Sequence, residues 1–296
     1  MTPSQPLPAR TEEMNWAIHP DTKLGYVHLT VRDLRKSLAF YEDALGFKIH
    51  SQSGGTARLG AGESDLLVLT ENPSARMAAR ATGLYHFAIL VPSRFHLAQS
   101  LRRIADTETQ VQGFADHLVS EAIYLADIDG NGIEIYRDRP RTEWYDARGN
   151  LQMGTARLDV HGVLDELTGR DERWNGLGDG TVLGHMHLQI ANVARDEAFY
   201  RDVLGFNVMA NLGSASFVSA GGYHHHLGMN TWNSAGAPPP PPNAVGLRYF
   251  TMQLPTSDAL SRTIDRVRRA GIAVEEMESG LLVRDPSHNS LVLKNN

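Results

Sequence analysis

The sequence contains no cysteine. This absence excludes disulfide bonds, thiolate zinc sites, iron–sulfur clusters and thiol nucleophiles. The chain also lacks a run of about 18 uncharged apolar residues, which a membrane-spanning helix would need. Residues 1–10 lack the apolar core of a signal peptide. We therefore expect a cytoplasmic protein with no membrane partner.

An excess of basic residues is missing as well. The 28 lysines and arginines are outnumbered by 34 acidic residues, which gives a formal net charge of -6. Nucleic-acid binding usually needs a positive face, so we expect no nucleic-acid partner. The glycines form no phosphate-binding motif. Because the chain has 13 histidines but no cysteine, a transition-metal site would use nitrogen and oxygen ligands.

The 296 residues are enough for two domains of ordinary size, and they contain an internal repeat. The segment Gly25–Phe47 resembles Gly184–Phe206, with a constant offset of 159 residues and no gap. A second, shorter pair matches Gly83–Pro92 with Gly246–Pro255. Each copy begins with a strand, continues into a helix and is followed by further strands. These repeats indicate four related units.

We name these units one to four, and they start near Leu24, Gly83, Leu183 and Gly246. The pattern predicts an α+β fold in which four βαβββ units form two paired, curved, mixed β-sheets. We expect an N-terminal domain over 23–140 with units one and two, a connector over 141–180, and a C-terminal domain over 181–296 with units three and four.

Metal-ligand residue types are distributed unevenly among the four units. At inward-facing strand positions, unit two has His86 and Glu134, and unit three has His185. The matching positions of units one and four are Tyr249, Val292 and Tyr26. A single strand histidine is more often structural than functional, but Glu134 lies between two isoleucines, and an unpaired buried carboxylate is costly. Two imidazoles and one carboxylate can bind one face of an Fe(II) ion as a facial triad, which leaves its other coordination positions open.

This uneven distribution also predicts how the units pair. A cavity built from units one and two would lack a second imidazole at the proper position. Pairing unit two with unit three completes the set, so we expect unit one to pair with unit four.

The four-unit pattern resembles the vicinal oxygen chelate superfamily, which includes glyoxalases, bleomycin-resistance proteins and extradiol dioxygenases. The spacing His117-x6-Tyr124-x2-Asp127-x2-Gly130-x3-Glu134 is similar to the extradiol ring-cleavage signature, with Ile128 where the signature usually has proline. Within the superfamily, the chain resembles the bacillar catechol 2,3-dioxygenase subgroup. The resemblance covers about residues 23–293.

The resemblance implies a role for particular residues. His86, Glu134 and His185 match metal ligands, whereas His117 and Tyr124 match residues that hydrogen-bond the bound catechol oxygen. In unit three a histidine of the run His224-His225-His226 matches the acid–base residue. Strand alternation places His224 and His226 on one face, so we expect that pair to be catalytic. His187 shares the face of His185.

The implied reaction is Fe(II)-dependent extradiol cleavage of catechol or a substituted catechol by O₂, with Mn²⁺ as an alternative metal and homo-oligomerisation compatible with the sequence. Two rival functions stay open. A glyoxalase-type lyase would add a fourth ligand from His224–His226 around Ni²⁺ or Zn²⁺. A metal-free module that binds a small aromatic molecule would need no ligand set.

Overall fold

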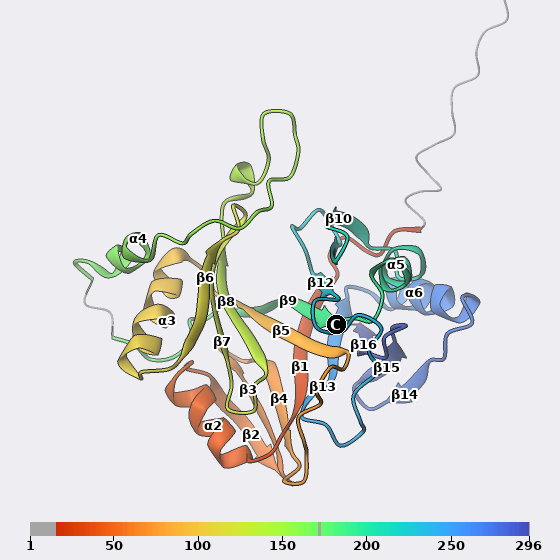
Figure 1. Cartoon of the computed structure of the whole chain (residues 1–296), viewed down its shortest axis with the longest axis horizontal. Coiled ribbons are helices and arrows are strands. Elements are labelled where there is room, and N and C mark those ends of the chain that lie inside the picture. Colours follow the sequence, from red (N-terminus) through yellow and green to blue (C-terminus); the bar gives the residue numbers. More distant parts are fainter. Residues whose placement is uncertain (1–15, 171–172, 296) are drawn as a thin grey trace, which may run out of the picture.

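The computed structural model describes residues 16–170 and 173–295, which form two mixed β-sheets of eight strands each (Figure 1). Each unit folds as one strand, one helical segment and three further strands, as predicted. Unit one comprises β1 (Lys23–Val31), α2 (Leu34–Asp43), β2 (Lys48–Ser53), β3 (Thr56–Ala61) and β4 (Ser64–Glu71). Unit two comprises β5 (Gly83–Leu90), α3 (Arg94–Asp106), β6 (Val111–Asp116), β7 (Ser120–Ala126) and β8 (Gly132–Asp138).

The second half of the chain repeats this order. Unit three comprises β9 (Val182–Gln189), α5 (Val193–Ala198) with a π-helical turn (Phe199–Val203), β10 (Asn207–Asn211), β11 (Ala215–Ser219) and β12 (Leu227–Asn230). Unit four comprises β13 (Gly246–Leu254), α6 (Ser257–Arg269), β14 (Glu275–Met277), β15 (Gly280–Arg284) and β16 (Ser290–Asn295). The five prolines at 238–242 lie in the loop between these two units, because proline cannot donate to a helix or a central strand.

The units pair across the two halves of the chain. β1 pairs antiparallel with β13, so one sheet joins units one and four. β5 pairs antiparallel with β9, so the other sheet joins units two and three. The predicted pairing is confirmed. Each sheet thus takes strands from both halves, while the division into domains at 23–140 and 181–296 stays a prediction.

The helical segments of units one and three have equivalent capping residues at both ends. The side chains of Asp33 and Asn192 accept hydrogen bonds from the backbone N–H groups of Lys36 and Arg195, at 3.0 and 2.9 Å. Such caps satisfy N–H groups that have no partner inside the helix. Gly46 and Gly205 follow the helical segments with φ values of 77° and 88°, a left-handed conformation that favours glycine.

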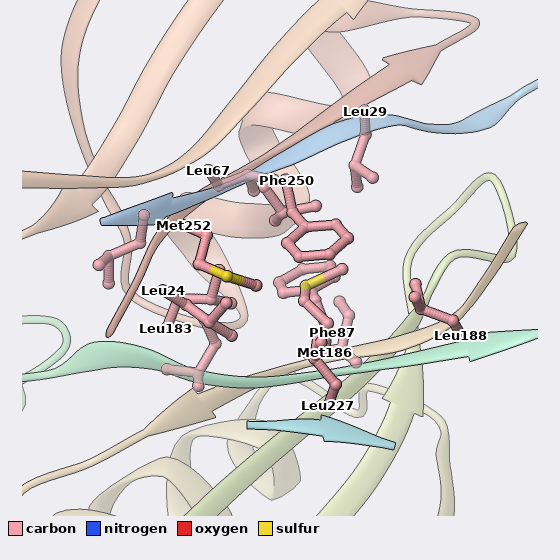
Figure 2. Close-up of a cluster of buried hydrophobic side chains, with 14 of the residues drawn as sticks. Leu24, Leu29, Leu67, Phe87, Leu183, Met186, Leu188, Leu227, Phe250 and Met252 are labelled. Carbon is pink, nitrogen blue, oxygen red and sulfur yellow. The ribbon is translucent and has the colours of Figure 1, made fainter. Parts of the chain in front are cut away.

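The core lies between the two sheets, where apolar side chains from both sheets meet (Figure 2). Phe87 of β5 and Met186 of β9 are fully buried there against Phe250 of β13. Successive residues of a strand point to opposite faces. His86 and His185, which precede Phe87 and Met186, therefore point away from this core.

A repeated hydrogen bond joins the helix of one unit to a loop of the next unit along the chain. The Tyr41 hydroxyl donates to Asp127 Oδ2 at 2.9 Å, and the Tyr200 hydroxyl donates to Asp285 Oδ2 at 3.0 Å. Asp127 also accepts from the backbone N–H of Asn131 at 2.8 Å. This loop leads into β8, so the contact fixes the start of the strand that contains Glu134.

The connector contains ordered structure in spite of its irregular sequence. It includes α4 (Val160–Leu164) and two 3-10 turns at Arg141–Glu143 and Asp165–Leu167. Trp144 and Val163 are buried against the rest of the fold. In the part of the chain that the structure describes, no helix is long and apolar enough to cross a membrane.

Candidate metal centre

Three adjacent strands bring His86, Glu134 and His185 together. In the second sheet, β5 lies between β9 and β8. Ala88 of β5 is the register partner of both His185 on β9 and Glu134 on β8. His86 lies two residues before Ala88 and on the same face. Because the Ala88 side chain is only a methyl group, the three longer side chains can converge above it.

The ligand atoms of this triad lie close together. Glu134 Oε2 is 3.0 Å from His86 Nε2 and 3.0 Å from His185 Nε2. One ligand atom from each residue lies within 4.8 Å of the others. All three side chains are buried. The two histidines can therefore share one metal ion although they belong to different units.

The donor set fits a metal ion. Two ligand atoms bound at right angles to a metal about 2.1 Å away lie about 3.0 Å apart, which matches the separations observed here. Within residues 16–170 and 173–295, His86 Nε2 and Glu134 Oε1 are buried without a hydrogen-bond partner. A buried polar atom without a partner costs about 1–3 kcal/mol. A cation between the three residues would remove that cost, and we assign this triad as the metal site.

The pKa shifts of the triad residues also favour a metal site. Burial alone would raise the pKa of Glu134, but the nearby imidazoles of His185 and His86 hold it well below its usual value. Burial lowers the pKa of His86, which favours its neutral, ligating form. Both shifts favour the forms that bind a metal ion, an ionised carboxylate and a neutral imidazole.

A cavity of about 700 Å³ opens beside the triad, and His117 and Tyr124 line it. His117 Nδ1 is 2.8 Å from the Gly154 carbonyl oxygen, which can only accept, so Nδ1 donates. Its Nε2 is 2.7 Å from the Tyr124 hydroxyl. Burial raises the pKa of Tyr124 well above its usual value, so the phenol stays protonated. Both residues of the expected pair thus lie in the cavity wall.

The histidine run differs from the expectation. His225 lines the cavity, whereas His224 and His226 do not. These residues form bends before β12 instead of continuing the strand, so strand alternation does not apply to them. His224 is fully buried behind the wall, with its Nε2 2.8 Å from Asp138. His226 Nδ1 accepts from the Ala220 N–H at 3.2 Å. The cavity wall thus contains His225, and the expected catalytic roles of His224 and His226 stay a prediction.

His187 shares the face of His185, as expected, and lines the cavity. Its Nε2 is 3.1 Å from the side-chain amide nitrogen of Asn230 on the neighbouring strand. A Cβ added to Gly228 would lie 3.0 Å from the His187 ring, so glycine there lets the ring lie over the strand. His187 is therefore part of the cavity wall beside the triad.

Several wall residues carried no signal in the sequence. Met153, Gly154 and Thr155 come from the connector, which has no period or motif to mark them. An aromatic set forms another part of the wall. It consists of Tyr85, Phe217 and the half-exposed Trp232. Only the position of Tyr85, next to a metal ligand, gave a local clue.

A family model described as the Glyoxalase/Bleomycin resistance protein/Dioxygenase superfamily matches residues 23–135 and 182–293. These segments make up most of the chain. The chain belongs to this superfamily. The model matches each half of this superfamily member once, in agreement with the repeat in the sequence.

A curated relative of this superfamily member is named Catechol-2,3-dioxygenase and comes from Bacillus subtilis (strain 168). It is 47% identical over 276 residues, which are 91% of this chain and 96% of the relative. Among solved structures, one from Bacillus subtilis has a TM-score of 0.64 at 12% identity, covering 95% of this chain and 85% of that chain. Glyoxalase I from Zea mays has a TM-score of 0.55 at 14% identity, with 92% of both chains covered. These two structures share the fold.

Proposed function

We propose that this protein is an Fe(II)-dependent extradiol dioxygenase that cleaves catechol or a substituted catechol with O₂. The observation that carries the proposal is the convergence of His86, Glu134 and His185 beside a cavity that also contains Tyr124 and His117. The 47% identity to a relative named Catechol-2,3-dioxygenase supports the same reaction. Mn²⁺ is the alternative metal.

The reaction needs no external reductant. Both atoms of O₂ enter the product, and the ring carbon–carbon bond beside one hydroxyl breaks. A bound Fe(II) would supply Lewis-acid and redox chemistry, and three protein ligands leave room for both reactants. The chain's own residues bind and orient the catechol and move its proton.

Tyr124 and His117 would contact a catechol oxygen. Their mutual hydrogen bond of 2.7 Å and the bond from His117 to Gly154 fix both side chains in the wall. Fixed donors and acceptors cost no reorganisation when charge develops on the substrate, and this is the basis of electrostatic stabilisation in an enzyme. We assign these residues to the substrate oxygen and not to the metal.

For the acid–base residue we propose His225 in place of His224 and His226. Its ring lies against that of His185, with centroids 4.2 Å apart, and it lines the cavity. Burial lowers the pKa of His225 well below its usual value, which keeps the ring neutral before substrate binds. A neutral ring has one nitrogen with a free lone pair, the group that a general base needs.

The cavity has room for a substituted ring. A single dihydroxybenzene fills on the order of 100–150 Å³, about three to five times a water's share of about 30 Å³. The cavity measures about 700 Å³. Phe217 and Trp232 provide aromatic surface beyond the triad. A catechol with an apolar substituent is therefore within the proposed substrate class.

The test is oxygen consumption by the anaerobically purified protein loaded with Fe(II). With catechol and a panel of substituted catechols, we expect O₂ uptake and a yellow semialdehyde product in equal amounts. No uptake across the panel, with iron bound at one per chain, would reject the dioxygenase and favour the metal-dependent lyase.

Three expectations from the sequence stay predictions. They are the cytoplasmic location, the homo-oligomer and the division into domains around the connector at 141–180. Size-exclusion chromatography with light scattering would measure the oligomeric state directly.

A further inference from the structure

A chain of hydrogen bonds runs from the cavity wall into the protein behind it. His225 Nδ1 lies 2.8 Å from His224 Nδ1, and His224 Nε2 lies 2.8 Å from Asp138 Oδ1. His224 is fully buried, whereas the Asp138 side chain keeps 24% of its exposure. The chain therefore joins a residue of the cavity to a carboxylate near the surface.

The carboxylate of Asp138 ends this chain of hydrogen bonds, and it determines which atom donates in each of them. Asp138 Oδ1 accepts the hydroxyl proton of Tyr223 at 3.2 Å, and an ionised carboxylate can only accept. His224 Nε2 must then be the donor to Asp138. A neutral imidazole carries a single N–H, so His224 Nδ1 is an acceptor.

The same reasoning continues to the cavity. Because His224 Nδ1 accepts, His225 Nδ1 must donate to it. The single N–H of neutral His225 is then on Nδ1, and its Nε2 carries the lone pair. The described part of the chain offers this Nε2 no hydrogen-bond partner, so it is free for a ligand in the cavity.

Packing holds this arrangement in place. The Trp144 ring lies edge-on to His224 with centroids 5.0 Å apart, and the Tyr223 ring lies 4.1 Å from it on centroids. His224 has no exposed surface through which water could replace a lost partner. Water therefore cannot replace Asp138 as the acceptor for the His224 Nε2 proton.

We propose that Asp138 and His224 are positioning residues that fix the tautomer of His225, so that its unprotonated Nε2 faces the cavity. This inference rests on the proposed function for the role of His225, but the tautomer itself does not depend on any reaction. A carboxylate that orients a histidine base is a known way to present the correct nitrogen to a substrate. Here the carboxylate acts through a second histidine.

The direct test is nitrogen NMR of the full-length protein labelled with ¹⁵N-histidine and loaded with Zn²⁺ as a diamagnetic probe. The His225→Gln variant identifies the His225 signals. We expect proton attachment at His225 Nδ1 in the unaltered protein. Attachment at Nε2 would overturn the proposal without any variant and without any measurement of activity.

The Asp138→Asn variant tests the cause. Its amide N–H can donate to His224 Nε2, which would reverse both histidines and move the His225 proton to Nε2, but its amide oxygen can also accept from His224. The Asp138→Leu variant, whose side chain has no acceptor, removes that alternative. A His225 proton that stays on Nδ1 alone in both variants would reject the role of Asp138. The matched control is Asp65→Asn, because Asp65 makes the same kind of contact with His50 Nδ1, at 2.8 Å and with 26% exposure, in the other sheet.

Kinetics supply the second readout. With catechol and Fe(II), Asp138→Asn should lower kcat by about 10²-fold, within the range of about 10²–10⁴ for losing acid–base catalysis, and change KM by less than about threefold. Combined with His225→Gln, it should add no further loss. Independent losses that multiply would contradict the proposal. If the unaltered protein cleaves no catechol, the proposed function fails while the NMR result still decides the tautomer.

Discussion

The two sheets have the same architecture but different residues at three equivalent positions. His185, His86 and Glu134 in units three and two correspond to Tyr26, Tyr249 and Val292 in units one and four. The Tyr26 and Tyr249 hydroxyl oxygens lie 3.4 Å apart, so these residues contact each other where the other sheet has its metal site. We therefore expect metal binding to depend on these three side chains and not on the shape of the sheet.

A fourth pair of positions is alike in both sheets. His187 Nε2 contacts the side chain of Asn230 at 3.1 Å, and His28 Nε2 contacts that of Thr70 at 2.8 Å. His187 lies two residues after His185, and His28 lies two residues after Tyr26. Because the contact is present with and without the triad, we interpret it as part of the scaffold. Comparing the sheets thus separates ligands from structural histidines.

The largest expected effect is that of Glu134→Gln. A neutral amide is a poor replacement for a carboxylate on a hard cation, so we expect the purified variant to retain less than about a tenth of the iron. Elemental analysis after anaerobic desalting measures this. Val292→Ala at the equivalent position is the control and should leave the iron content unchanged. Retention of full iron by Glu134→Gln would remove Glu134 from the ligand set.

The second effect concerns the two histidine ligands. His185→Ala and His86→Ala should weaken iron binding equally, because each removes one of the three ligands, although the residues belong to different units. Competition with a chromogenic chelator gives the affinities. Tyr26→Ala and Tyr249→Ala are the matched controls, and a loss of iron in either would contradict the division of roles between the sheets.

A smaller effect is expected for Tyr124→Phe. This variant keeps the ring but loses the hydroxyl, so iron should stay bound while turnover falls by about 10²-fold, the size typical of losing one transition-state hydrogen bond. Steady-state O₂ uptake and iron content are measured on the same sample. Iron loss as severe as in Glu134→Gln would mean that Tyr124 supports the metal instead of the substrate.

The smallest effect is expected from substitutions of Gly184 and Gly25. These glycines come directly before His185 and Tyr26, the first pair of positions that differ between the sheets. An added Cβ at Gly184 would lie 1.9 Å from the Tyr136 hydroxyl oxygen, and one at Gly25 would lie 2.4 Å from Thr251 Oγ1. Overpacking of this kind costs about 1–3 kcal/mol, so both alanine variants should lower the Tm by several degrees.

Only Gly184→Ala should also weaken iron binding, because it displaces the strand beside His185. Gly113→Ala is the control, since an added Cβ there meets no atom within 4 Å. Calorimetry gives the Tm and chelator competition gives the affinity. Equal iron affinity in the Gly184 and Gly25 variants would show that the triad tolerates a shift of β9.

Much of the fold could be predicted from the sequence because the repeat preserves its offset. The gapless match of His28 with His187 defines the units, and the residues at positions 26, 249 and 292 indicate which units pair. Glu134 was recognisable because a carboxylate between buried isoleucines needs a partner. These signals depend on strand alternation, which both halves of the chain obey.

The rest of the site depends on segments without a period. The run at 224–226 bends before its strand, so alternation could not show that His225 faces the cavity. Gly154 and Thr155 reach the wall from the connector through tertiary packing alone. The link between Asp138 and His224 joins units two and three, and only the folded sheet brings these residues together.

The most direct test of the central claim is a crystal structure of the iron-loaded protein with anomalous data collected at the iron edge. The comparison of the two sheets predicts one iron per chain, bound by His86, Glu134 and His185, and none between Tyr26 and Tyr249. A fourth protein ligand from His225 would contradict the dioxygenase site and favour the lyase. An iron peak away from the triad, or one in the sheet of units one and four, would contradict the division of roles between the two sheets.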